Sequence, residues 1–196
     1  MRIIFLSLAF LCFTIVAFSQ RFMHGVGLAG TMGTSKQDFI VGAGLTYSPR
    51  INIIQNDALS VSVGIPVTVT LTSYSPKDPG TTYYQGANGH ELNAPLIINL
   101  SLGRGSTRDN SNKFGYFIGG GGGYHYIYTR SDMVNLSGMS FTSTDNSSLL
   151  GWAVNAGLRV GIGESHKNLE LRLSYMKTIQ DYHNNMIFGG AVLFNF

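Results

Sequence analysis

The chain has 196 residues, of which 12% are charged and 44% are hydrophobic, and its formal net charge is +3. Ordinary soluble domains carry about 25% charged residues, so the chain is too poor in charge for a typical cytosolic surface and too apolar for a disordered protein. Lysine and arginine form no cluster along the chain, which argues against nucleic acid as a partner.

The N-terminal segment has the pattern of a secretion signal. An almost unbroken apolar run follows Arg2, and the small residues Ala17 and Ser19 stand at the positions that precede a cleavage site. A membrane anchor is the alternative, but the run is shorter than the ~20 residues that a spanning helix needs. We therefore expect a signal peptide over residues 1–19 and a single domain over residues 20–196.

After this segment the hydrophobic pattern has a period of two, which is typical of β-strands with one apolar face. In the clearest case, aliphatic residues alternate with serine, glycine, proline and threonine from Leu59 to Thr72. We expect eight such strands, each long enough to cross a bilayer when tilted, which takes ~9 to 11 residues. The expected strands are Phe22–Gly33, Phe39–Ser48, Leu59–Thr72, Leu92–Leu102, Phe114–Thr129, Trp152–Ile162, Leu169–Met176 and Met186–Phe196.

Long and short links alternate between most of these strands. The links at residues 73–91 and 130–148 are long and polar, whereas the links around "STRDNSN" and "ESHK" are short. The link through "PRINIIQN" is longer than a tight turn. An even number of strands with long loops at one end and tight turns at the other is typical of outer-membrane barrels. We therefore predict an all-β fold, an eight-stranded antiparallel up-and-down transmembrane β-barrel with both termini in the periplasm.

Two features favour this barrel over a soluble barrel or sandwich, which also alternates. The charged residues within the strand centres are Arg159, Glu170 and Arg172, and all three lie opposite the apolar face. Aromatic residues on the apolar face gather near the strand ends, as expected for rings at two bilayer interfaces. In hydrocarbon every backbone polar group must be paired within the protein, so a lipid-facing sheet has to close on itself.

The chain ends in "FGGAVLFNF", where Val192, Phe194 and Phe196 alternate on one face. With this ending and the strand pattern, the sequence resembles the small outer-membrane β-barrel proteins of the OmpA/OmpX type over essentially the whole mature chain. The resemblance implies that the terminal pattern is the signal read by the barrel-assembly machinery. It also implies a location in the cell outer membrane, in contact with outer-membrane lipids.

Arg159, Glu170 and Arg172 are expected to meet inside the barrel. If the "ESHK" turn is symmetric, Arg159 lies opposite Arg172 and Glu170 lies diagonal to Arg159. A carboxylate between two guanidinium groups would offset their mutual repulsion. We interpret the three as a structural network in the lumen, because eight strands enclose a space that side chains about fill. An anion-selective constriction is the alternative.

The stretch "GYFIGGGGGYHYIY" resembles a phosphate-binding loop, but an aromatic strand follows it where such a loop needs a helix. We predict a strand whose inward glycines form a wall that leaves room for the long side chain of Arg159. Gly120 and Gly122 then face lipid, and neighbouring aromatic rings are expected to cover them. The glycine wall consists of Gly119, Gly121 and Gly123.

No residue set predicts a metal, cofactor or catalytic site. His90, His125 and His183 are expected at the outer end of the barrel, with Glu91 or Asp181 near them, but their spacing is not that of paired metal ligands. The single cysteine lies in the expected signal peptide. Some outer-membrane enzymes of this size use serine with histidine and a carboxylate, and no such constellation is recognisable here.

The sequence therefore predicts a non-enzymatic integral outer-membrane barrel with a narrow, side-chain-filled lumen and a structural or surface-interaction role. An extracellular ligand or surface would be contacted through the loops at residues 73–91 and 130–148. Two alternatives stay open, a small passive, porin-like channel and an outer-leaflet lipid-modifying enzyme. A soluble periplasmic barrel is the structural alternative.

Overall fold

A computed structural model describes residues 22–34, 38–76, 83–107, 109–134, 140–163, 167–179 and 186–196. The expected signal peptide, residues 1–19, lies outside the described residues, as do His166, Asp181 and His183. Within the described ranges the regular structure is β-strand, and no helix is long and apolar enough to cross a membrane.

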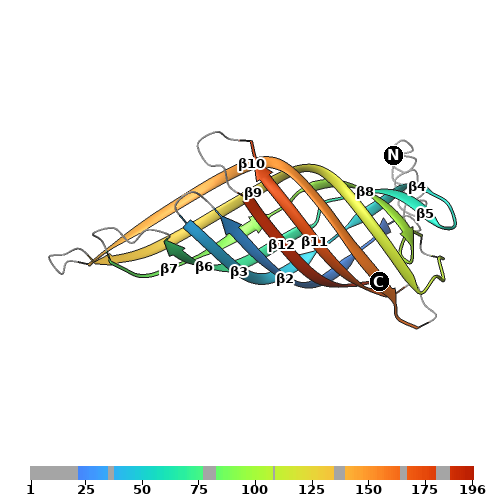
Figure 1. The fold of residues 1–196 in the computed structure, drawn as a ribbon, viewed down its shortest axis with the longest axis horizontal. Helices are drawn as coiled ribbons and strands as arrows, with labels where there is room; N and C mark the ends of the chain where they lie inside the picture. The colour runs from blue at the N-terminus through green and yellow to red at the C-terminus, as the bar shows by residue number, and fades with distance from the viewer. Residues whose placement is uncertain are drawn as a thin grey trace, which may run out of the picture.

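The strand segments join into eight antiparallel strands that close into a barrel (Figure 1), so the predicted fold class is confirmed. The ring closes where β12 pairs with β2, which satisfies the backbone of what would otherwise be two open edges. The first four strands are β1 (Phe22–Met23) with β2 (Gly25–Thr34), β3 (Asp38–Tyr47) with β4 (Arg50–Gln55), β5 (Leu59–Gly64) with β6 (Val67–Pro76), and β7 (Tyr83–Asn93) with β8 (Leu96–Gly103). The last four are β9 (Phe114–Val134), β10 (Ser140–Gly161), β11 (Asn168–Thr178) and β12 (Met186–Asn195).

Proline accounts for three of the interruptions within these strands. Pro49 separates β3 from β4, Pro66 separates β5 from β6, and Pro95 separates β7 from β8. Proline has no backbone N–H and cannot donate to the ladder, so the pairing lapses there and resumes beyond it.

The barrel has apolar side chains outside and polar side chains inside. Leu28, Leu71 and Leu173 are 69%, 76% and 73% exposed, whereas Ser60 and Glu170 are fully buried. The predicted alternation is therefore present, with its apolar face turned outward. Soluble monomers rarely expose contiguous apolar patches larger than a few hundred Å², and here such residues lie on every part of the wall. We call this surface the apolar belt.

Aromatic rings lie near both ends of the apolar belt. At one end the Phe196 ring lies 4.3 Å from the His24 ring, measured between centroids. At the other, Tyr175 lies 5.3 Å from Trp152 and 5.0 Å from Phe188. Phe188 lies on β12 and Phe196 directly follows that strand, so the two are about 26 Å apart along the chain at ~3.3 Å per residue. A tilt of ~40° reduces the height of this span to ~20 Å, somewhat less than the ~25 Å apolar band of outer-membrane barrels.

The prediction of long loops at residues 73–91 and 130–148 is wrong in part, because strands extend far into both. β9 and β10 stay paired as far as Val134 opposite Ser140, and β7 pairs with β9 from Tyr83 onward. These three strands form a sheet that extends well past the rim of the barrel (Figure 1, left). We call it the projecting sheet. Its serine, threonine and asparagine residues show no apolar alternation, so the sequence pattern concealed these strands.

The "PRINIIQN" segment is also a strand, β4, and not a link. β4 pairs with β5, and the register shifts between Asn52 and Ile54. This bulge adds one residue, which breaks the alternation that identified the other strands. The true turn is short, with the Asn56 N–H donating to the Leu59 carbonyl at 2.7 Å.

Candidate functional site in the barrel lumen

A buried charge cluster occupies the lumen, centred on Glu170. β11 alternates leucine outward with charge inward, which places the Glu170 carboxylate inside with no exposed surface. Its Oε2 accepts from Arg159 Nε at 2.7 Å and from Arg50 Nη1 at 3.2 Å. Its Oε1 accepts from Arg172 Nε at 2.9 Å. One carboxylate thus binds three guanidinium groups, and we call these four residues the lumen cluster.

The cluster joins the three charged residues predicted from the sequence, but the predicted register is wrong. Arg159 lies directly opposite Glu170, and Arg172 lies opposite Gly157. The shift is two residues, because the turn closes with the Ile162 N–H donating to the Lys167 carbonyl and with Gly163 at a φ of +66°. A shift of two keeps every side chain on its face, so the three residues still meet.

Neutral groups satisfy further donors of the cluster. Arg159 Nη1 donates to Ser101 Oγ at 3.2 Å and to the Gly105 carbonyl at 3.1 Å. Arg172 Nη2 donates to Ser48 Oγ at 2.8 Å. Asn195 Nδ2 donates to Glu170 Oε2 at 3.1 Å. Hydrogen bonds from Ser48, which follows β3, and from β8 and β12 therefore hold the cluster from several sides of the barrel.

An aromatic ring supports the two guanidinium groups. The guanidinium carbon of Arg159 lies 4.3 Å from the centroid of the Phe117 ring, and that of Arg172 lies 5.8 Å from it. Cations over a ring face are attracted by its quadrupole, more strongly where water is excluded. The ring and the ion pairs together make this level of the lumen a packed layer of side chains.

The sequence prediction missed Arg50 and Phe117. The sequence pattern places Arg50 in a link, because the bulge in β4 interrupts the alternation that marks a strand. Its signal was present, since Arg50 and Asn52 alternate with Ile51 in the way that Glu170 and Arg172 alternate with Leu171. Phe117 is a large apolar residue facing inward on β9, so alternation alone could not mark it as part of a charged site.

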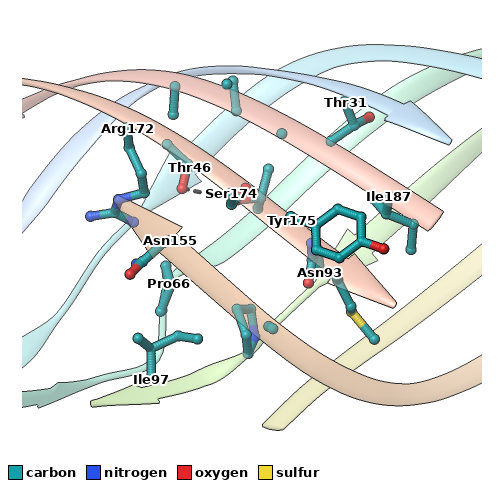
Figure 2. Close-up of a pocket in the computed structure, with 18 of the residues that line it drawn as sticks. Thr31, Thr46, Pro66, Asn93, Ile97, Asn155, Arg172, Ser174, Tyr175 and Ile187 are labelled. Carbon is teal, nitrogen blue, oxygen red and sulfur yellow. Dashed lines mark hydrogen bonds between the residues drawn. The ribbon is translucent and has the colours of Figure 1, made fainter. Parts of the chain in front are cut away.

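A small cavity of about 50 Å³ with a mixed, mainly apolar lining borders the lumen cluster at Arg172 (Figure 2). Figure 2 shows Thr46, Asn93, Asn155 and Ser174 around it, and Thr68 Oγ1 donates to Thr46 Oγ1 at 3.0 Å. A water molecule occupies ≈ 30 Å³ in the liquid, whereas pockets for drug-sized ligands measure ≈ 300–1,000 Å³. The cavity has room for water or a single ion and not for an organic substrate.

The glycine wall lies against groups other than the predicted Arg159 side chain. A Cβ at Gly119 would lie 2.2 Å from Asn99 Oδ1, and one at Gly123 would lie 2.7 Å from Met176 Sδ. One at Gly121 would lie 1.9 Å from the Leu96 carbonyl oxygen. The prediction that these glycines make room for Arg159 is therefore wrong, because Asn99, Met176 and the backbone of β8 fill that space.

The expectation that aromatic rings cover Gly120 and Gly122 is also wrong. A Cβ at Gly120 would lie 3.7 Å from Val154 Cγ1, which is aliphatic, and a Cβ at Gly122 would meet no atom within 4 Å. Aromatic rings therefore do not cover Gly122, although Trp152 stands opposite it in the ladder.

The histidines expected together at the outer end do not converge. His90 is exposed and stacks on Tyr128 with ring centroids 4.7 Å apart, whereas His125 is fully buried inside. Glu91 lies inside as well, where its Oε2 accepts from Thr31 Oγ1 at 3.0 Å and from Thr70 Oγ1 at 3.2 Å. Among the described residues no three histidine, cysteine or acidic side chains group as metal ligands.

The terminal residues Val192, Phe194 and Phe196 share the outward face of β12 and the residue after it. The rings of Phe194 and Phe196 stack with centroids 6.0 Å apart. The Phe196 N–H donates to the His24 carbonyl at 3.1 Å, which ties the end of the chain to the first strand. All three side chains are available to a partner that approaches from the lipid side.

The solved structures to which the chain is similar include Ail of Yersinia pestis, determined in complex with the heparin analogue sucrose octasulfate. That likeness has 13% identity and a TM-score of 0.46 and covers 90% of this chain and 98% of Ail. Neisserial surface protein A shares 13% identity at a TM-score of 0.44, covering 89% of this chain and 95% of its own. The N-terminal β-barrel domain of Pseudomonas aeruginosa OprF shares 13% at 0.42, covering 88% and 97%.

The chain itself folds as a closed eight-stranded antiparallel β-barrel. No family model matches the sequence, and no curated protein matches it. At such low identity a likeness extends to the fold alone, so function has to be inferred from this chain's own residues.

Proposed function

We propose that the protein is an integral outer-membrane β-barrel that is closed to solutes and has no enzymatic role. The observation that carries the proposal is the combination of the apolar belt with the lumen cluster. The belt suits hydrocarbon, and the buried cluster occupies the space that a pore would need. Both termini would face the periplasm, the projecting sheet would face outward, and the terminal residues Val192, Phe194 and Phe196 would be read by the barrel-assembly machinery.

The belt supports a membrane location more strongly than a soluble periplasmic one. Each exposed leucine of the belt removed from water contributes ≈ 25 cal/mol per Å² of apolar surface. Because the lumen side is polar and already packed, the barrel has no other place to bury these side chains. We expect the protein in the outer-membrane fraction after carbonate washing, soluble only with detergent. Recovery in the soluble periplasmic fraction would contradict the proposal.

The lumen contents argue against the channel and the enzyme. The Arg159 and Arg172 side chains are nearly fully buried between Glu170 and Phe117, which leaves no open path at this level of the described lumen. Both ring nitrogens of His125 have no hydrogen-bond partner, so no neighbouring group orients this buried histidine as a catalytic base.

The projecting sheet supports a surface-interaction role. β11 pairs with β10 over residues 151–161, and the Leu150 carbonyl accepts from the Ile179 N–H. Among the described residues no strand pairs with this edge of β10 over residues 140–149, which is therefore an exposed edge of the sheet. An exposed edge offers unpaired backbone donors and acceptors that an extended peptide can pair with. We therefore propose extended polypeptide as the ligand class of this surface.

A peptide-display selection tests this role. Extended peptides selected on the refolded full chain should lose binding to a variant in which residues 130–144 are replaced by a two-residue turn, which removes paired positions symmetrically. A variant with Asp145→Asn, which alters one exposed side chain and keeps the edge, is the matched control. Equal binding of the selected peptides to the shortened variant would refute the role of the projecting sheet, while leaving the barrel proposal intact.

A further inference from the structure

The lumen cluster carries more positive than negative charge. Arg50, Arg159 and Arg172 share the single carboxylate of Glu170, and all four side chains are buried. The other buried carboxylate of the described residues, Glu91, accepts from the hydroxyls of Thr31 and Thr70 and takes part in none of the described ion pairs. Buried charges are normally paired, so the excess charge of this lumen calls for an anion.

Arg50 has the donors that such an anion needs. Its Nη1 binds Glu170, but its Nε and Nη2 have no hydrogen-bond partner although the residue is only 3% exposed. These two N–H groups lie on the same edge of the guanidinium, which is the edge that forms bidentate hydrogen bonds with oxyanions. Unpaired buried donors are destabilising, so an edge left free in this way requires a partner.

Two serines without hydrogen-bond partners lie on the neighbouring strand β5, on the same inward face as Arg50. Ser62 is on β5, opposite Asn52 and therefore diagonal to Arg50 on the inward face. Ser60 follows it on the same face and lies opposite Ser101, whose hydroxyl already accepts from Arg159. Both side chains are fully buried, and neither Oγ has a hydrogen-bond partner. A hydroxyl donates to an anion without adding charge, and two of them can complete its coordination.

We propose that the lumen holds one small monovalent anion, of which chloride is the representative, bound by Arg50 Nε and Nη2 with the hydroxyls of Ser62 and Ser60. The anion offsets part of the excess charge and fixes Arg50 against Glu170. The anion is a permanently bound part of the lumen cluster and does not pass through the barrel.

Bromide locates such a site directly, because it replaces chloride and scatters anomalously. Crystals of the full chain grown in sodium bromide should give an anomalous peak within hydrogen-bond distance of Arg50 Nε, Nη2 and Ser62 Oγ. No peak at Arg50, or peaks confined to the exterior of the barrel, would overturn the proposal. This experiment needs no variant, so a folding defect cannot obscure its result.

Chloride should also stabilise the folded protein. At constant ionic strength, the urea midpoint of the refolded chain should be higher in sodium chloride than in sodium gluconate, whose anion is too large for the site. The Ser62→Ala variant should show a smaller difference, and Arg50→Gln should show none. Arg130→Gln, which removes an exposed arginine outside the lumen, is the matched control and should keep the wild-type difference. Equal midpoints of the wild type in the two salts would contradict the proposal.

Discussion

Replacing Glu170 with glutamine should destabilise the barrel strongly. The change keeps the shape of the side chain but removes the one negative charge that three buried arginines share. It also places amide hydrogens against guanidinium hydrogens at one of the two oxygen positions. Removing one partner of a buried ion pair costs ~3–5 kcal/mol, because the remaining charge is left unpaired in a place that water does not reach. We expect the free energy of unfolding to fall by about this amount.

The measurement is urea unfolding of the refolded protein in lipid vesicles, followed by tryptophan fluorescence. Trp152 is the single tryptophan of the chain and lies 44% exposed on the apolar belt, so it moves from lipid to water on unfolding. The control is Asp132→Asn, which removes a carboxylate from an exposed pair with Arg130 at 4.0 Å. Exposed pairs contribute ~0–1 kcal/mol, so the control should change little.

A double variant separates the charge effect from a general loss of packing. Glu170→Gln combined with Arg159→Met removes one unpaired cation and keeps an apolar side chain over Phe117. It should be more stable than Glu170→Gln alone, since an apolar group of similar volume can replace a buried ion with little loss. If Glu170→Gln cost no more than Asp132→Asn, or if the double variant were the weaker of the two, the cluster would not stabilise the barrel through charge.

Two further predictions concern packing and assembly. Gly121→Ala should lower the free energy of unfolding by ~1–3 kcal/mol, because the new Cβ would lie 1.9 Å from the Leu96 carbonyl oxygen. Gly122→Ala should change it by less than ~0.5 kcal/mol, because its Cβ would meet no atom within 4 Å. Heat-modifiable gel mobility and urea midpoints compare the two variants, and equal losses would contradict the close approach at Gly121. Phe196→Ser should reduce assembly into the outer membrane in cells and leave refolding in detergent unchanged. Phe188→Ser, which alters an outward aromatic residue of β12, is the control. Equal assembly of the two variants would show that Phe196 is not part of the assembly signal.

The sequence predicted the wall of the barrel because an apolar exterior and a polar interior impose a period of two. The segments around Leu71, Ile98 and Leu171 were assigned correctly, with their faces, for this reason. Where the constraint is absent the prediction failed. The projecting sheet meets water on both faces, so the Ser143–Ser148 region has no apolar period, and the bulge at Asn52 and Ile54 shifts the period within β4.

Three charged residues of the lumen cluster could be predicted from the sequence, but their neutral hydrogen-bond partners could not. Arg159, Glu170 and Arg172 stood out because inward charge is rare in an apolar strand pattern. The partners Ser48, Asn195 and Ser101 are ordinary inward polar residues, and nothing local marks them as hydrogen-bonding groups of a cluster. Asn195 lies on β12, which pairs directly with β11, whereas Ser48, which follows β3, and Ser101 on β8 reach the cluster only through the closure of the barrel.

The closed lumen is tested most directly by single-channel recording of the refolded wild-type protein in planar bilayers. With the lumen cluster in place, insertion of the protein should produce no steady conductance steps in potassium chloride. Glu170→Gln, if it still inserts, should produce transient openings, because the three arginines then lose their common anchor. Steady, uniform conductance of the wild type would contradict the closed barrel and would favour the passive channel.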